Sequence, residues 1–222
     1  MQVYEPTSRS RLKRLPARGA YDRETIYAIL DEGLVAHVGI AEGEQPFVLP
    51  MTYGRLGDRL ILHGSPASRT LRALADGAPA CVCVTLLDGL VLARSAFHHS
   101  LNYRSVVLFA RGRELTEEAE KRRALDAVVE HVIPGRTEHA RGPSEYELRA
   151  TLVLELPLDE ATAKLRSGPP ADDAEDLGLP VWAGTIPLPF TPGPPEPDPT
   201  LAPEIEPPGY VTRYARPRRE RP

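Results

Sequence analysis

Residues 46–69 read PFVLPMTYGRLGDRLILHGSPASR, and this stretch contains two strands, a turn and the start of a helix. The runs 46–54 and 59–63 are rich in apolar and β-branched residues, and the segment 55–58 between them has the glycine and aspartate of a tight turn. Ser65 or Pro66 then opens a helix that ends at Gly77. The stretch therefore predicts an antiparallel hairpin that leads directly into a helix.

The segments on both sides continue this pattern of strands with helices inserted between them. Upstream, Asp22 can cap a helix that stops at Gly33, and a strand follows it at 34–41. Downstream, the pattern predicts a strand at 80–87, a hairpin turn at Asp88-Gly89, strands at 90–93 and 103–113, a helix at 116–132 and a last strand at 150–156. Helices do not alternate strictly with strands, and no dinucleotide or Walker glycine motif is present. The sequence predicts a mostly β fold with inserted helices, an antiparallel barrel.

Composition divides the chain into three parts. Residues 1–19 form a basic arm with little periodicity, whose simplest state is solvated coil, and residues 20–186 form the barrel domain. Residues 187–222 hold 12 of the 24 prolines together with several acidic residues, so we expect an extended tail with neither strand nor helix. The apolar segment 181–190 ahead of this tail would allow it to dock on a partner subunit.

Net charge and hydropathy exclude several classes of protein. The chain has 27 basic and 31 acidic residues, so no overall positive field attracts nucleic acid or anionic lipid. Asp88 interrupts the most apolar region, 78–93, and the N-terminus does not resemble a signal peptide. Cys81 and Cys83 point to one face of a strand, where they pack as small residues. We expect a cytoplasmic protein that binds neither nucleic acid nor membranes.

The segment 63–69 is the first candidate site, because a strand passes into a helix there. Such a junction offers free backbone N–H groups and the positive end of the helix dipole, which together suit an anion. Ser65 and Ser68 add hydroxyl donors, Arg69 adds a guanidinium that matches a phosphate, and Gly64 allows close approach of the backbone. The alternative is an ordinary serine cap with a solvated arginine.

The segment 97–107 is the second candidate site, because it is polar and aromatic and lies directly ahead of a strand. His98 and His99 point to opposite faces of an extended chain, so they do not ligate one metal together, and we expect no metal site. Asn102, Tyr103 and Arg104 are either binding residues or polar packing at the rim of the barrel.

Four motifs in order make the chain recognisable: FVLPMTYG (47–54), LHGSPASR (62–69), DGLVLA (88–93) and HSLNYRSVV (99–107). Together they resemble the pyridoxamine 5'-phosphate oxidase-related family of FMN-binding split barrels, and within it the branch of the nitroimidazole-resistance proteins. The resemblance covers residues 14–189. The arginine and histidine motif with which the true oxidases bind pyridoxamine phosphate is absent after Trp182, so we do not expect that activity.

The resemblance implies an antiparallel split β-barrel that forms a homodimer with FMN at the subunit interface. Residues expected at the isoalloxazine are Pro50, Met51, Thr52 and Tyr53. Residues expected around the phosphate are His63, Gly64, Ser65, Ser68 and Arg69. Residues expected to approach the flavin region, in one arrangement from the other subunit, are Asn102, Tyr103 and Arg104.

The resemblance also implies a flavin-dependent oxidoreductase. We expect electrons to pass from a reduced nicotinamide through FMN to a small flat acceptor such as a nitroaromatic or a quinone. His63 and His99 are the candidate proton donors, because histidine titrates near neutral pH. The alternative is a binding or carrier protein that holds FMN, a deazaflavin or haem without turnover. A reading of Ser65 as a nucleophile with His63 as its base has no elbow motif to support it.

Overall fold

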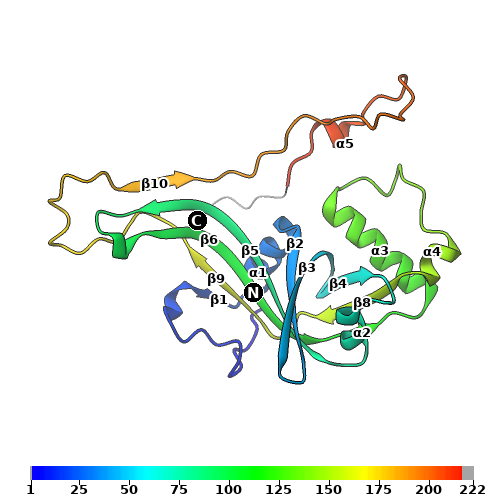
Figure 1. Cartoon of the computed structure of the whole chain (residues 1–222), viewed down its shortest axis with the longest axis horizontal. Coiled ribbons are helices and arrows are strands. Elements are labelled where there is room, and N and C mark those ends of the chain that lie inside the picture. Colours follow the sequence, from blue (N-terminus) through cyan, green and yellow to red (C-terminus); the bar gives the residue numbers. More distant parts are fainter. Residues whose placement is uncertain (1, 217–222) are drawn as a thin grey trace.

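The computed structural model describes residues 2–216, which form one antiparallel sheet of ten strands (Figure 1). Nine strands follow the order β1-β9-β6-β5-β2-β3-β4-β8-β7, and β10 pairs with β5. The strands are β1 (Gly19–Ala20), β2 (Val35–Glu42), β3 (Gln45–Leu56), β4 (Arg59–Gly64), β5 (Pro79–Leu92), β6 (Ser100–Arg111), β7 (Arg113–Glu114), β8 (Leu152–Pro157), β9 (Ala161–Arg166) and β10 (Gly184–Pro187). The predicted hairpin and helix of residues 46–69 are present, and the mostly antiparallel fold is confirmed.

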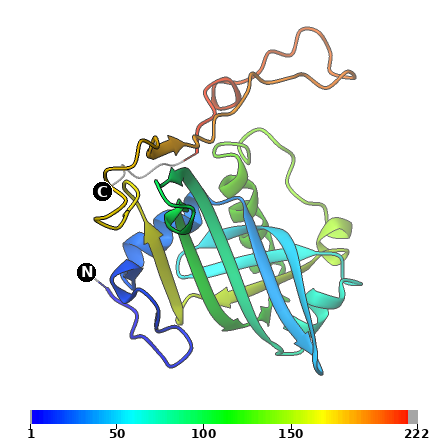
Figure 2. The same ribbon diagram turned by 60° about the vertical axis from the view of Figure 1, so that its left-hand side comes forward.

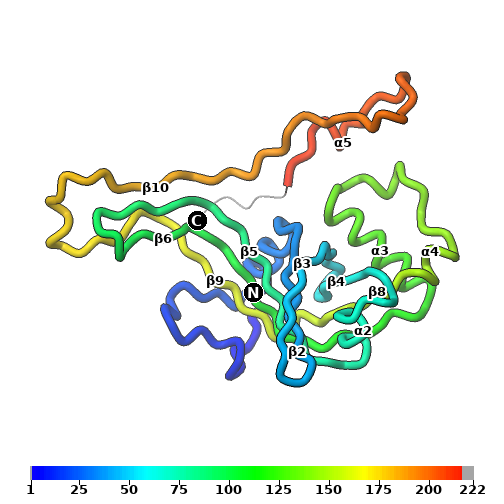
Figure 3. The backbone as a smooth tube through the Cα atoms, viewed as in Figure 1, coloured from blue at the N-terminus to red at the C-terminus, as the bar shows by residue number. Residues whose placement is uncertain are grey.

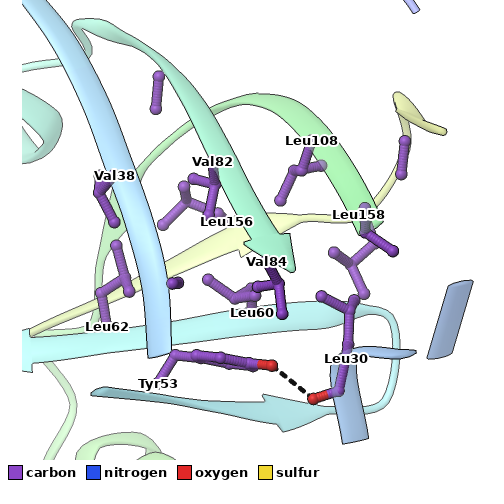
Figure 4. Packing of buried hydrophobic residues seen from close by; sticks show 14 of the residues in the cluster. Leu30, Val38, Tyr53, Leu60, Leu62, Val82, Val84, Leu108, Leu156 and Leu158 are labelled. Carbon is purple, nitrogen blue, oxygen red and sulfur yellow. Dashed lines mark hydrogen bonds between the residues drawn. The ribbon is translucent and has the colours of Figure 1, made fainter. Parts of the chain in front are cut away.

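The strand β3 divides the sheet into the two halves of a split barrel. Its residues 45–52 pair with β2, whereas its residues 53–56 pair with β4. In Figure 2, β2, β5 and β6 cross in front of the cyan β4, so the sheet folds over on itself. Figure 4 shows the core between the two halves, which is filled by apolar side chains from β2, β3, β4, β5, β6, β8 and the helix α1 (Arg23–Glu32). Burial of these side chains is the main stabilising contribution to the fold.

Two helices cover the barrel at different places. The helix α1 begins where the sequence predicts, because Asp22 Oδ1 accepts a hydrogen bond from the Thr25 N–H at 2.8 Å. The helix α3 (Glu118–Val132) packs on the outer side of β3 and β4. A Cβ at Gly54 would lie 2.8 Å from the Val128 Cα, so glycine is needed for this close approach. The remaining short helices are α2 (Arg69–Ala75), α4 (Glu145–Arg149), α5 (Gly209–Thr212) and the 3-10 turns at Pro16–Arg18 and Ala96–His98.

The hairpin turn predicted at Asp88-Gly89 is wrong, because β5 continues through both residues. The ladder between β5 and β6 shifts register between Leu87 and Gly89, and the chain turns only after Leu92. Gly89 is placed opposite β10, where a Cβ would lie 2.9 Å from the Ile186 carbonyl oxygen. Glycine is therefore needed at this position because β10 passes close to it, and not because the chain turns there. The strands β5 and β6 project far beyond the barrel (Figure 1).

The predicted end of the ordered pattern at 150–156 is also wrong, since β9 and β10 follow it. The strand β9 lies between β6 and β1, and the N-terminal arm packs beside it. Thr162 Oγ1 donates a hydrogen bond to the Ser10 carbonyl at 2.6 Å, and Tyr4 is buried. The arm therefore lies against the barrel and not in solvent.

The proline-rich tail leaves the barrel after β10, extends away from it and then returns (Figure 3). It contributes Pro187 to the β10 ladder and forms the short helix α5, so the prediction of neither strand nor helix is wrong in part. Pro187 ends the ladder at a sheet edge, where a missing N–H is tolerated. Arg216, the last described residue, is buried against the ends of α1 and α3. Within residues 2–216, no helix has the length and apolar character to cross a membrane.

Candidate functional site

The first candidate site is the loop between β4 and α2. Ser65 makes a tight turn, because its Oγ accepts from the Ala67 N–H at 3.1 Å and its carbonyl accepts from the Ser68 N–H at 2.9 Å. Ser68 then caps α2 by accepting from the Leu71 N–H at 3.4 Å. The helix therefore begins at Arg69, later than the predicted Ser65 or Pro66, because the Ser65 side chain competes for the backbone.

Arg69 lies at the start of α2 with an exposed guanidinium. Its side chain is 61% exposed, lies 4.1 Å from the centroid of the Phe47 ring and is 3.9 Å from the Glu42 carboxylate. Within residues 2–216, the backbone N–H groups of Arg69 and Thr70 have no acceptor, as expected in the first turn of a helix. The loop thus combines two free donors with one cation, which is the arrangement that an anion needs.

His63 lies at the end of β4 with an unsatisfied ring atom. Its Nδ1 is buried and has no hydrogen-bond partner, and burial lowers the pKa of the ring below its ordinary value. A neutral imidazole with one free buried nitrogen is suited to a hydrogen bond with a bound ligand. A Cβ at the next residue, Gly64, would lie 2.9 Å from Leu71 Cδ1, so this glycine also lets the start of α2 pack closely.

The four expected residues of β3 do not share one environment. Pro50 and Thr52 are exposed on the outer face and Met51 is half-buried. Tyr53 is fully buried, and its hydroxyl donates to the Leu30 carbonyl at 2.5 Å (Figure 4). Because the side chain of Tyr53 lies in the core, only its backbone could contact a ligand.

The outer face of β3 continues onto β2 and β5. In the ladders His37 of β2 is opposite both Pro50 of β3 and Cys83 of β5. His37 is exposed, whereas its neighbours Ala36 and Val38 are fully buried. The sequence reasoning missed His37, although a lone histidine between two apolar strand residues signals a side chain that points outward.

Arg104 lies among carboxylates and not at an open surface. Its guanidinium donates to Glu32 at 2.5 and 2.9 Å and to Asp88 at 2.8 and 2.9 Å. These hydrogen bonds, with Glu32 first, raise the pKa of Arg104 above its ordinary value. Glu32, Asp88 and Arg104 form the Arg104 triad, which joins α1, β5 and β6 and holds the bulge at Asp88 in place.

The neighbouring residues of β6 make different contacts. Asn102 accepts a hydrogen bond from Arg166 and donates one to the Gly168 carbonyl at 3.1 Å, while Tyr103 is half-buried. His99 Nδ1 lies 2.9 Å from the Ser95 carbonyl in the connection between β5 and β6. This connection lies at the outer end of the hairpin, whereas β4 with His63 belongs to the barrel (Figure 1). The structure therefore does not bring the two candidate proton donors together.

Two cavities flank the Arg104 triad. The tail cavity, of about 580 Å³, lies between the end of α1, the outer faces of β2 and β5, and the tail residues 188–190 and Arg216. His37, Val35 and Leu87 are among its lining residues. The hairpin cavity, of about 470 Å³, lies between β6, the segment 165–169 and the start of β10. Within residues 2–216, no group of three or more His, Cys, Asp or Glu side chains is arranged to hold a metal ion.

Comparison with known families decides what kind of barrel this is. Residues 22–165 match the family described as pyridoxamine 5'-phosphate oxidase. The chain belongs to the pyridoxamine 5'-phosphate oxidase family. This match covers the split barrel from α1 to β9 and confirms the resemblance drawn from the four motifs. A search of the curated proteins finds no match.

Solved structures of other proteins show similarity over most of the chain. The flavocytochrome Anf3 from Azotobacter vinelandii is 43% identical, with a TM-score of 0.88 over 94% of this chain and 97% of that one. An FAD- and haem-binding protein from Mycobacterium smegmatis is 41% identical, with a TM-score of 0.84 over 87% of this chain and 95% of that one. A 5-nitroimidazole antibiotic resistance protein from Bacteroides thetaiotaomicron is 27% identical, with a TM-score of 0.54 over 64% of this chain and 83% of that one.

The first two similarities extend beyond the matched barrel of the oxidase family. The family match ends at residue 165, yet 94% of the chain is covered by the Azotobacter structure. Coverage of 94% of the chain includes most of the N-terminal arm and the C-terminal tail as well as the barrel. The tail is therefore part of a shared architecture, whereas the resemblance of the four motifs covers residues 14–189 alone.

Proposed function

We propose that this protein binds a flavin and a haem and transfers electrons between them. The observation that carries the proposal is identity of 43% and 41%, over nearly whole chains, to a flavocytochrome and to an FAD- and haem-binding protein. This favours the alternative of a flavin- or haem-binding protein over the expected reduction of small acceptors by FMN. The flavin is proposed without choosing FMN, because the second relative is described with FAD.

The loop between β4 and α2 has the groups to hold the flavin's phosphate. Free N–H groups at Arg69 and Thr70, the Arg69 guanidinium and the Ser65 hydroxyl would surround it. The buried, unpaired Nδ1 of His63 would gain a partner from the same ligand. The exposed outer residues Pro50 and Thr52 would lie against the ring system.

The tail cavity has the groups to hold the haem. A haem needs apolar walls and an axial ligand, and imidazole is a common ligand for iron. Among residues 2–216, His37 is the only histidine that lines this cavity, and its side chain is exposed. Val35, Leu87 and Phe190 supply apolar wall, and the volume lies within the range of cofactor sites. His37 is therefore the residue that would hold the haem iron.

The two sites lie on adjacent strands, which suits electron transfer. When bound, a flavin exchanges one or two electrons and a haem iron exchanges one. The chain's own contribution is to position both groups on one rigid sheet, with His37 of β2 directly opposite Pro50 of β3. The tail residues 188–190 form one wall of the tail cavity.

The proposal includes a homodimer, as the sequence resemblance implies. The outer face of the sheet exposes Val48 and the segment ahead of β10 exposes Trp182, and exposed apolar side chains can mark interaction surfaces. A second copy would cover this face and the proposed flavin.

A second candidate function is the reduction of nitroaromatics by a reduced nicotinamide through the flavin. The observation that favours it is the structural similarity to the 5-nitroimidazole antibiotic resistance protein. Oxidation of reduced nicotinamide that requires an added nitroaromatic would support this function, and its absence with a flavin-loaded protein would exclude it.

The variant His37→Ala tests the haem site. We expect His37→Ala to lose most of its haem, measured as the pyridine haemochrome, and to keep its flavin. The control is His139→Ala, since His139 is exposed on another part of the chain and does not line the tail cavity. Full haem content and an unchanged spectrum in His37→Ala would show that His37 is not the ligand.

A further inference from the structure

The hairpin cavity contains a buried arginine that no carboxylate neutralises. Arg166 at the end of β9 is only 9% exposed and lines the cavity. Its Nη1 donates to Asn102 Oδ1 and its Nη2 donates to the Pro169 carbonyl at 3.3 Å, and both acceptors are uncharged. Among residues 2–216, no Asp or Glu lies within ion-pair distance of Arg166. A buried guanidinium without a counter-charge is costly, so its retention here requires a reason.

The surroundings of Arg166 add positive charge instead of removing it. Burial lowers the pKa of Arg166 below its ordinary value, and the nearby charge of Arg18 lowers it further. Arg18 comes from the basic arm, which pairs Gly19 with Lys164 of β9 and so brings this arginine close. The basic arm therefore supplies a second cation to the same end of the sheet.

The acidic residues near the cavity are already paired with another arginine. Asp88 lines the cavity, but both of its carboxylate oxygens accept from Arg104, which also binds Glu32. The charged residues that line the cavity are Asp88, Arg104 and Arg166, which gives two positive charges and one negative charge. The cavity thus has an excess of positive charge with Arg166 as its buried source.

Neutral donors and a fixed orientation complete the site. Ser167 and Thr185 also line the cavity, and their hydroxyl groups can donate hydrogen bonds. The side chain of Asn102 cannot turn its amide toward Arg166, because its Nδ2 donates to the Gly168 carbonyl. Asn102 therefore holds the guanidinium of Arg166 in place at the wall of the cavity.

We propose that the hairpin cavity binds the anionic group, phosphate or carboxylate, of a small molecule through Arg166. The guanidinium presents planar paired donors that match both groups. The anion comes either from a free ligand or from a phosphate of a tightly bound cofactor. The site is separate from the loop at Arg69, and binding of a free ligand there does not depend on the proposed flavin and haem sites.

The test is calorimetric titration of the full-length purified protein with inorganic phosphate and with succinate at low salt. The variant Arg166→Gln keeps an amide that can bond Asn102 but removes the charge. We expect saturable binding of at least one probe by the wild type and at least a tenfold weaker affinity in Arg166→Gln. Arg166→Lys keeps the charge and is expected to recover part of the affinity.

Two further variants control the test. Arg149→Gln removes a positive charge from the exposed face of α4 and is expected to bind as the wild type does. Arg18→Gln changes a less buried residue and is expected to weaken binding by a smaller factor. If circular dichroism shows that Arg166→Gln does not fold, Arg18→Gln replaces it as the test variant.

The outcomes distinguish the two sources of the anion. Loss of probe binding in Arg166→Gln indicates a free ligand. A wild type that binds neither probe, together with reduced cofactor content in Arg166→Gln, indicates a cofactor phosphate at the same site. The proposal is overturned if the wild type and Arg166→Gln bind the probes with equal affinity. It is also overturned if the wild type binds neither probe and the cofactor content of Arg166→Gln is unchanged. Absence of flavin and haem from the wild type would overturn the proposed function but not a phosphate titration that depends on Arg166.

Discussion

Arg69 is the residue on which the proposed phosphate site depends most. Its guanidinium rests on Phe47 and is mostly in solvent, at 61% exposure, so it is free to turn toward a ligand. We expect Arg69→Ala to lower flavin affinity about tenfold or more, because a hydrogen bond to a charged group contributes about 1.5–3 kcal/mol. Titration by flavin fluorescence, with circular dichroism on the same samples, measures the change.

The control for Arg69 must be chosen by its contacts. Arg72, one turn along, donates to the Pro66 carbonyl at 2.6 Å and so supports the loop itself. Arg149 is 70% exposed and, within residues 2–216, its ion pair is with Glu145 on its own helix, so Arg149→Ala is the better match. Equal flavin affinity in Arg69→Ala and Arg149→Ala would mean that the phosphate binds elsewhere.

Tyr53 belongs to the core, and its hydroxyl joins β3 to the end of α1. Removing this hydroxyl leaves the buried Leu30 carbonyl without its partner, so we expect Tyr53→Phe to lower the free energy of unfolding by about 1–2 kcal/mol. Flavin content should stay unchanged. Urea denaturation measures the effect, with Tyr146→Phe at an exposed tyrosine as the control. Unchanged stability with reduced flavin content would instead place the Tyr53 hydroxyl in the binding site.

At the scale of the elements, Arg216 joins the tail to the ends of two helices. Its guanidinium donates to the carbonyls of Asp31 and Glu32 at the end of α1, and to those of His131 and Val132 at the end of α3. The last carbonyls of a helix have no intrahelical donor and carry the negative end of the dipole, so a buried cation stabilises both ends together.

We expect Arg216→Ala to lower the free energy of unfolding by about 2 kcal/mol, because several buried carbonyls lose a charged donor. Thermal or urea unfolding measures the loss. Arg213→Ala removes an exposed arginine from the same part of the tail and should have little effect. If both variants were equally stable, the tail would not be held by this contact.

Elements defined by local signals were predictable from the sequence, and those defined by distant contacts were not. Asp22 caps α1 through its own backbone neighbours, and the strands around the turn at 55–58 follow from apolar patterning. Asp88-Gly89 has the sequence of a turn, but its aspartate binds Arg104 and its glycine faces β10, which lies about a hundred residues later in the chain. The roles proposed for His37 and Arg166 depend on cavities that distant segments of the chain complete, so the local sequence does not predict them.

At the scale of the whole molecule, the exposed apolar residues favour a dimer. Val48, Phe190 and Trp182 are each more than half exposed, and the edge-rich split barrel has surfaces that a second copy would cover. Light scattering at micromolar concentration should give twice the mass of the 24.4 kDa chain. A mass of one chain at that concentration would contradict the homodimer.

The central claim concerns the whole molecule as well: one barrel with a flavin at the loop of Arg69 and a haem beside His37. The absorbance spectrum of the purified full-length protein, before and after reduction, tests it most directly. We predict a haem Soret band that shifts on reduction, together with a flavin that is released on denaturation and identified by chromatography. A protein loaded with flavin and supplied with haem during expression, yet showing no Soret band, would contradict the claim.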